Sequence, residues 1–319
     1  MKKKTIGHLI FYPAFLIILS LVFKNQIVSA LSGYNGFDLS DALIDVGEIH
    51  HGGPAKDGIP AIDQPQFIPV SKAGYLSGDD RVLGLNFNGV SKAYPIKILN
   101  YHEIVNDHFN NKPVAITYCP LCGSGVGYLS ELNGKSTSFG VSGLLYNSDV
   151  LLYDRETQSL WSQLLSKAIS GPQKGTELEM LPLIHTSWQA WKMENQDTLV
   201  LSENTGFKRD YSRTPYGNYD NSKSLYFPVN KLNTDYHPKE YVIGLKMSGK
   251  TKVYPFAELS KITSPFKDSF TGKELTVIFD AKNRTGKIID KNQNEIPTIT
   301  SFWFAWMAFY PDSTIFKAK

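Results

Sequence analysis

The chain has 319 residues, a formal net charge of +3 and the composition of an ordinary globular protein rich in aromatic residues. It contains no low-complexity tract and, after the first 30 residues, no basic run interleaved with aromatic residues, so we expect no nucleic-acid partner. About 290 residues remain after that segment, which is enough for one large domain or for two packed lobes.

Residues 1–30 have the layout of a signal peptide. Three lysines at positions 2–4 precede an apolar run from Leu9 to Phe23, and a small-residue stretch follows. The apolar run of about 15 residues is short for a membrane span, which needs about 20, but attachment through residues 6–23 stays open. We therefore predict an exported protein (periplasmic, cell-surface or secreted), either cleaved or anchored. Without the four leader lysines the net charge is about −1.

Two segments separated by 160 positions resemble each other. Residues 82–99 and 242–259 share 8 identities over 18 positions. The first 14 residues of each segment alternate between apolar and polar around a turn, Asn88-Gly89 in the first and Ser248-Gly249 in the second, which predicts a β-hairpin. The similarity therefore indicates an internal repeat.

The repeat extends beyond the hairpin. After one residue of slippage, residues 107–118 correspond to residues 268–279, and a later tryptophan pair (Trp188 and Trp191) is echoed by Trp303 and Trp306. We predict a mainly β, α+β fold with two unequal related lobes, each containing the hairpin, a short helix and a strand. The N-terminal lobe spans residues 31–230 and holds a long insert. The shorter C-terminal lobe spans residues 231–319.

Residues 100–109, after the first hairpin, are predicted to be helical. Tyr101 and Val105 share an apolar face, while His102 and Glu103 lie on the polar neighbour. A return of the chain after this helix brings His102 toward the strand that follows. His102 then either serves as a ligand or hydrogen-bonds a neighbouring strand, and the sequence leaves both readings open.

The two cysteines, Cys119 and Cys122, lie in residues 117–125 with the sequence TYCPLCGSG. Two sulfurs at this spacing can close a redox disulfide or present two thiolates to one soft metal ion. Glycines at positions 123, 125 and 127 do not start a helix well, so we predict a tight turn between strands 114–118 and 126–130. A c-type haem is excluded because Gly123 stands where the ligating histidine would be, and no nucleotide fingerprint is present.

These residues give two hypotheses for the site. In the first, Cys119, Cys122 and His102 bind a metal, with copper preferred on softness grounds and zinc second, and with Glu103 or Asp107 orienting the ligands. In the second, the pair is a dithiol redox centre in which Cys119 attacks and Cys122 resolves. Both hypotheses call for a redox or metal-delivery partner, and the sequence does not decide whether the protein is an enzyme.

An alternative of another class is a non-catalytic binding or scaffolding module. In this interpretation the two tryptophan segments contact a glycan or a partner, and the cysteines form a structural disulfide. After the cysteines, residues 139–143, 150–154 and 157–163 are predicted to be successive strands. Their polar side chains either line a cavity or belong to ordinary turns.

Several of these runs together resemble a prokaryotic family described as domain of unknown function 3179. The matching runs are residues 57–60, 94–95, 102–107, 117–124, 154–163 and 302–306. The resemblance implies no established activity. It implies that members are exported or membrane-anchored, in agreement with the leader.

Overall fold

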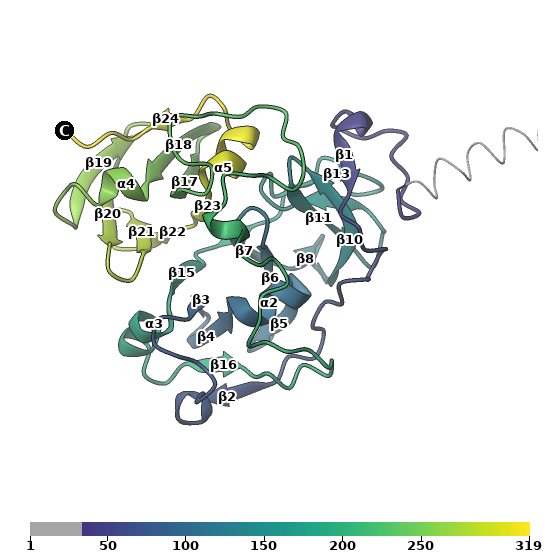
Figure 1. Cartoon of the computed structure of the whole chain (residues 1–319), viewed down its shortest axis with the longest axis horizontal. Coiled ribbons are helices and arrows are strands. Elements are labelled where there is room, and N and C mark those ends of the chain that lie inside the picture. The colour runs from purple at the N-terminus through teal and green to yellow at the C-terminus, as the bar shows by residue number, and fades with distance from the viewer. Residues whose placement is uncertain (1–33) are drawn as a thin grey trace, which may run out of the picture.

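The computed structural model describes residues 34–319. The predicted leader lies outside the described residues, so its role stays a prediction. Among residues 34–319 no helix is long and apolar enough to cross a membrane. The described chain is mainly β with short helices, as predicted from the sequence (Figure 1).

The N-terminal hairpin belongs to a five-stranded sheet. Its order is β15 (Ile184–Ser187), β3 (Arg81–Phe87), β4 (Val90–Pro95), β16 (Leu199–Leu201), β2 (Phe67–Pro69). A second five-stranded sheet carries the insert in the order β1 (Ile49–His51), β10 (Phe139–Tyr146), β11 (Asp149–Asp154), β12 (Leu160–Ser162), β13 (Lys167–Ser170). The hairpins predicted at residues 82–95 and 242–255 are both confirmed.

An eight-stranded sheet joins the two halves of the chain. Its order is β24 (Thr314–Ile315), β18 (Lys250–Pro255), β17 (Tyr241–Met247), β23 (Ile299–Phe302), β7 (Ser124–Leu129), β6 (Lys112–Cys119), β5 (Ile104–Phe109), and β14 (Met180–Leu181) pairs with β7. The C-terminal sheet contains β19 (Phe266–Phe270), β20 (Lys273–Asp280), β21 (Thr285–Ile289) and β22 (Glu295–Ile296). A small ribbon pairs β8 (Glu131–Leu132) with β9 (Lys135–Ser136).

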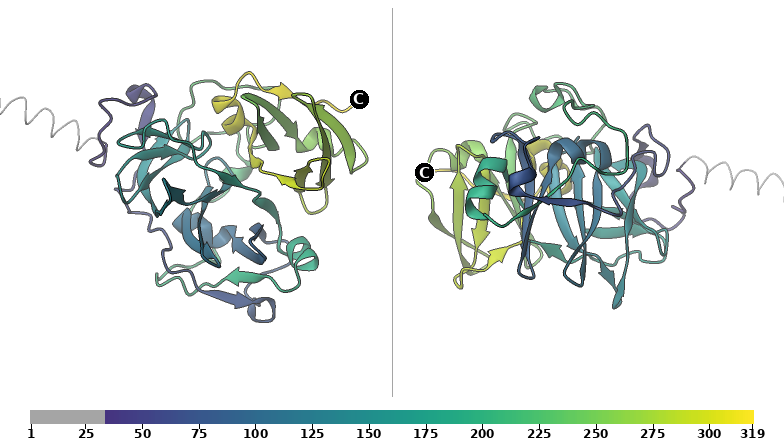
Figure 2. Two further views of the ribbon diagram at one scale, coloured as in Figure 1. Left: turned by 180° about the vertical axis from the view of Figure 1, so that it is seen from behind. Right: turned by 90° about the horizontal axis from the view of Figure 1, so that it is seen from below.

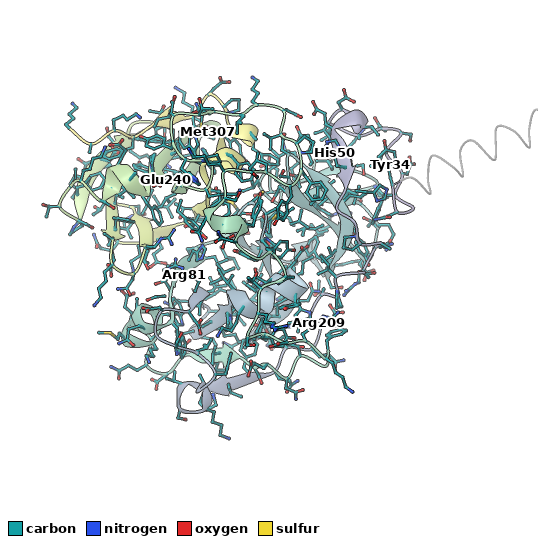
Figure 3. All side chains as sticks on the ribbon, viewed as in Figure 1. Tyr34, His50, Arg81, Arg209, Glu240 and Met307 are labelled. Atoms are coloured by element: carbon teal, nitrogen blue, oxygen red, sulfur yellow. The ribbon has the colours of Figure 1, made fainter. Side chains whose placement is uncertain are left out.

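The helices are short and connect strands. They are α2 (Ile96–His102), α3 (Trp188–Glu194), α4 (Phe256–Leu259) and α5 (Trp303–Phe309), with three 3₁₀ turns, η1 (Val46–Glu48), η2 (Val70–Lys72) and η3 (Tyr219–Asn221). The C-terminal strands gather beside the N-terminal ones in every view (Figures 1 and 2). Side chains fill the space between the sheets (Figure 3).

The two lobes pair their strands in matching registers. In the first, β15 pairs with β3 so that Ile184 lies opposite Gly84, and in the second β23 pairs with β17 so that Ile299 lies opposite Gly244. A helix follows each of these strands, and then a strand parallel to the hairpin, β16 beside β4 and β24 beside β18. These pairings support the internal repeat, which stays a prediction together with the lobe boundaries.

The helix predicted over residues 100–109 is wrong in its second half. Helix α2 ends at His102, and residues 104–109 form β5, which pairs antiparallel with β6. The change occurs at Glu103, whose φ of 57° lies in the left-handed region and turns the chain back. The β-branched Ile104 and Val105 then enter the sheet, where such side chains are favoured.

Candidate thiol site

Cys119 ends β6 and lies opposite Ser124, the first residue of β7, so residues 119–124 form the predicted tight turn. We call these residues the cysteine turn. Within it, the Cys122 amide donates to the Cys119 carbonyl at 3.2 Å. Gly123 has a φ of +57°, and a Cβ there would lie 2.8 Å from Phe302 Cζ. Only glycine therefore fits this position without displacing Phe302.

Both cysteines are free thiols buried in the largest apolar cluster of the described chain. Cys119 is 1% exposed and Cys122 is fully buried. The neighbouring strand β23 fixes the turn, because the Phe302 amide donates to the Cys122 carbonyl at 2.8 Å. The two sulfurs are thus held by both halves of the eight-stranded sheet.

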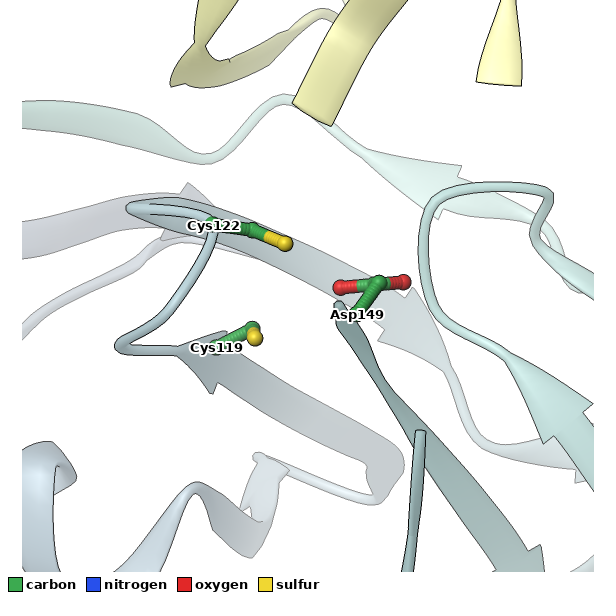
Figure 4. A group of neighbouring side chains, drawn as sticks. All are labelled: Cys119, Cys122 and Asp149. Carbon is green, nitrogen blue, oxygen red and sulfur yellow. The ribbon is translucent and has the colours of Figure 1, made fainter. Parts of the chain in front are cut away.

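Asp149, at the start of β11, is the third member of the site. One carboxylate oxygen of Asp149 and the sulfurs of Cys119 and Cys122 all lie within 4.8 Å of one another (Figure 4). The preceding turn residues Asn147 and Ser148 both have positive φ. Both thiols donate to the Ser148 carbonyl, at 3.7 Å from Cys119 and 3.3 Å from Cys122. The β10–β11 turn therefore supplies both the acceptor and the carboxylate.

The Asp149 carboxyl is only half satisfied. Its Oδ2 accepts a hydrogen bond from the Leu164 amide at 3.0 Å, whereas its Oδ1 has no hydrogen-bond partner among the described residues. Asp149 is 1% exposed, and burial raises the pKa of its carboxyl to about 7, against the lowering effect of the Leu164 amide. A carboxyl with this pKa exchanges its proton near neutral pH.

Burial also raises the pKa of both thiols, and the charge of Asp149 adds to this effect. The rise is larger for Cys122, where Cys119 also opposes ionisation, whereas Cys122 stabilises the thiolate of Cys119 by hydrogen bonding. Cys119 is therefore the first of the pair to lose its proton. At neutral pH both sulfurs are thiols, as their donation to Ser148 requires.

The buried side-chain amide of Gln163 hydrogen-bonds both strands next to the cysteine turn. Gln163 accepts a hydrogen bond from the Ser124 hydroxyl at 2.6 Å and donates to the Thr117 hydroxyl at 2.9 Å. The Thr117 hydroxyl in turn donates to the Val126 carbonyl at 2.9 Å. All three side chains are buried, so the network fixes the strands on both sides of the sulfurs.

Glu103 lies close enough to act electrostatically on the site. Its charge raises the pKa of Cys119, and Asp149 raises the pKa of Glu103. Burial is the main cause of the Glu103 shift and brings the pKa of this carboxyl to about 8. Its carboxyl accepts a long hydrogen bond of 3.5 Å from the hydroxyl of Tyr216.

His102 and Asp107 do not join the cluster. The ring nitrogens of His102 are 2.8 Å from the Pro60 carbonyl and 2.7 Å from the Tyr211 hydroxyl, and burial lowers the pKa of the ring. His102 thus follows the hydrogen-bonding alternative, and the third position beside the sulfurs belongs to Asp149. Asp107 binds Lys92 at 2.8 Å and the Tyr94 hydroxyl at 2.6 Å instead.

Asp149 was missed because the sequence carries only a weak signal for it. It precedes the apolar residues 150–153 and follows two residues that favour turns, so it reads as the edge of a strand. Such an acid is normally exposed. The alternative hypothesis requires tryptophans that are accessible to a glycan or a partner. In the structure Trp188, Trp191, Trp303 and Trp306 are all at most 2% exposed.

A family model for proteins of unknown function, DUF3179, matches residues 56–294. The match includes the cysteine turn, Asp149 and Glu103. No curated protein and no solved structure matches the chain. Since the family model covers well over half of the 319 residues, the chain belongs to the DUF3179 family.

Proposed function

We propose that the protein is a dithiol redox protein whose working group is the pair Cys119 and Cys122. The observation that carries this proposal is the Asp149 carboxyl, which lies within 4.8 Å of both sulfurs and has one oxygen without a partner in the described chain. A thiol reacts as its thiolate, so a buried thiol needs a nearby base. Asp149, with a pKa of about 7, is such a base.

In the proposed reaction Asp149 takes the proton of Cys119, and the thiolate attacks a two-electron acceptor of the disulfide or quinone class. Cys122 then attacks the Cys119 sulfur, and a disulfide forms between the two. Two electrons and two protons pass to the acceptor in total. Cys119 is the attacking sulfur because its pKa is raised less than that of Cys122.

A redox titration tests this function. The purified protein is equilibrated in thiol–disulfide buffers of graded potential, the remaining thiols are trapped with a maleimide, and the products are resolved by mass. We expect one reversible two-electron transition in the wild type and none in Cys119→Ser or Cys122→Ser. A pair that stays reduced, or a bridge that cannot be reduced in the folded protein, would reject the proposal.

Metal binding is the second candidate, and the free Asp149 oxygen favours it as well. Zinc accepts both thiolate and carboxylate ligands, so two cysteines and Asp149 would give it three ligands. Copper(I), the metal preferred from the sequence, would use the two sulfurs alone. Metal analysis of the Asp149→Asn variant distinguishes the two ions. We expect its zinc content to fall below that of the wild type if the site binds zinc, and its copper content to stay unchanged if the site binds copper(I). No bound metal in the wild type would reject this candidate.

We also propose that the protein works outside the cytoplasm. The first support is the leader-like layout of residues 1–30. The second is that an oxidising compartment supplies the electron acceptors that a dithiol redox protein needs. Cell fractionation tests this location. Recovery of the chain only from the cytoplasm, with residues 1–30 intact, would reject it.

A further inference from the structure

A cavity of about 360 Å³ lies against the cysteine turn. Its lining is largely apolar and includes Ile59, Leu121, Val141, Leu145, Val150 and Phe227. Cavities of this volume with apolar walls and few polar groups are typical of small-molecule sites. The volume suits a ligand with one or two rings.

The cavity meets the thiol site at two points of the chain. Leu121 lies between the two cysteines in the cysteine turn, and Val150 directly follows Asp149 in β11. Tyr216, also in the lining, interacts electrostatically with Cys119. A ligand in the cavity therefore lies against residues that adjoin the cysteines and Asp149 in the chain, although these three residues are not themselves in the lining.

Glu103 is the only side chain in the lining with a carboxyl group. It is 6% exposed, and the hydrogen bond that it accepts from the Tyr216 hydroxyl is long at 3.5 Å. With a pKa of about 8, Glu103 is mostly protonated at neutral pH and can donate a hydrogen bond. An acceptor oxygen on a ligand in this largely apolar space would complement such a donor.

We propose that this cavity is the substrate pocket of the dithiol and takes a small quinone, whose ring packs on the apolar wall and whose carbonyl oxygen accepts a hydrogen bond from Glu103. The inference rests on the proposed dithiol function. The reaction balances: two S–H bonds break, one S–S bond forms, and the quinone gains two electrons and two protons to become a hydroquinone. No other reactant is needed.

Duroquinone is the probe, because its fully methylated ring leaves no free ring position for substitution by thiols. Reduced protein is mixed with it under anaerobic conditions, and hydroquinone is followed by absorbance. We expect one hydroquinone and one Cys119–Cys122 disulfide per chain. Diamide, a small oxidant that needs no pocket, is run in parallel. If diamide closes the disulfide and duroquinone does not, the quinone inference fails and the dithiol function stands. If neither reagent closes it, the dithiol function itself fails.

Two variants of Glu103 test the hydrogen bond. Glu103→Gln keeps a donor, whereas Glu103→Leu has a similar size and none. We expect the Leu variant to bind duroquinone about tenfold more weakly and the Gln variant to stay near the wild type, because an unmade buried hydrogen bond costs about that much. Binding is measured by equilibrium dialysis in the Cys119→Ser/Cys122→Ser background, where no reaction occurs. Thermal unfolding first confirms that both Glu103 variants are folded. If the two folded variants then bind duroquinone with equal affinity, the assignment of Glu103 is overturned.

Discussion

The cysteine turn has a counterpart between β20 and β21, where Asp280 lies opposite Thr285 just as Cys119 lies opposite Ser124. In the C-terminal turn, Asp280 accepts hydrogen bonds from the amide and the side chain of Asn283, and Asn283 in turn accepts hydrogen bonds from Arg81 and Ser187. The cysteine turn instead donates its thiol protons to Ser148. The Asp280 carboxylate is therefore satisfied within its own turn, whereas the two thiols depend on a second segment.

The surroundings of the two turns differ in the same way. Every residue of the cysteine turn is buried, whereas Asp280, Lys282 and Arg284 are exposed. The insert strands β10 and β11 contribute to this burial together with Phe302 of β23. The same pair of strands brings Asp149. The hairpin and the strand pairings around the two turns therefore match, whereas the buried surroundings that raise the pKa of Asp149 and of the two thiols are found at the cysteine turn.

The largest expected effect concerns a buried ion pair found in both lobes. Lys92 binds both oxygens of Asp107, at 2.9 and 2.8 Å, and both residues are less than 8% exposed. Asp107→Asn leaves the Lys92 charge without a counter-charge and should lower the free energy of unfolding by about 4 kcal/mol. Urea denaturation measures this.

The matched variant is Asp268→Asn, which removes the counterpart of Asp107 beside Lys252. The Asp268 side chain is 16% exposed, so solvent partly compensates the lost charge. We expect a loss of about 2 kcal/mol. A larger loss for Asp268→Asn than for Asp107→Asn would contradict this ranking.

A close contact between a glycine and a tryptophan also occurs in both lobes. A Cβ on Gly84 would lie 2.2 Å from Trp191, and one on Gly244 would lie 2.0 Å from Trp306. Gly84→Ala and Gly244→Ala should each destabilise the protein by about 3 kcal/mol, because the indole ring is packed and cannot move aside. Gly89→Ala is not a suitable control, because the φ of +77° at Gly89 would itself strain an alanine. Gly74→Ala is a suitable control: a Cβ at Gly74 would have nothing within 4 Å, so the substitution should change the free energy of unfolding little.

The sequence predicted the two hairpins and the cysteine turn well because their signals are local. The hairpins follow from alternation and from turn pairs such as Asn88-Gly89, and the cysteine turn follows from its glycines. The site was only partly predictable because it is assembled from segments far apart in the chain. The sequence leaves open whether His102 binds a metal or a hydrogen-bond partner. In the structure its ring nitrogens lie near the Pro60 carbonyl and the Tyr211 hydroxyl, which are 42 and 109 residues away in the chain, so the local sequence does not indicate these contacts.

The predicted repeat offers a structural check on the helix prediction. Residues 266–270, the predicted counterpart of residues 105–109, form strand β19, just as residues 104–109 form strand β5. Asp149 had no such control. Its position depends on how the insert sheet packs on the cysteine turn, and the insert has no second copy to compare.

The third prediction tests the chemistry that the second lobe lacks. Asp149→Asn removes the base beside the thiols and also the charge that raises their pKa. We expect the loss of the proton acceptor to dominate, so that alkylation of Cys119 by iodoacetamide slows about 100-fold. Only the ionised carboxylate accepts a proton, so the wild-type rate should rise as the pH passes about 7, and this step should be missing in the variant. Glu103, with a pKa of about 8, adds a second charge near Cys119, so the profile is also recorded in Glu103→Gln.

Asp280→Asn is the control for this experiment, because it makes the same change in the C-terminal turn. Asp280 lies in the exposed turn and bonds to Asn283, so the thiol reactivity should be unchanged. A pH profile of Asp149→Asn that matches the wild type would remove Asp149 from the mechanism. The outcome separates a base that acts on the sulfurs from an acid that only shapes the β10–β11 turn.

The smallest expected effect concerns the indole hydrogen bonds that close the two frameworks. Trp191 donates to the Thr198 hydroxyl and Trp306 to the Ser313 hydroxyl, both at 2.9 Å. Trp191→Phe and Trp306→Phe each lose this bond together with some packing, so double-mutant cycles with Thr198→Val and Ser313→Ala are needed to isolate it. We expect a coupling energy of about 1 kcal/mol in each lobe. Both hydroxyls also donate to a backbone carbonyl, and the Ser313 hydroxyl also lies 2.9 Å from the Thr251 hydroxyl. The indole is an added donor in both cases, so we expect coupling energies of similar size. Unequal couplings would show that matching geometry in the two lobes conceals different packing around the tryptophans.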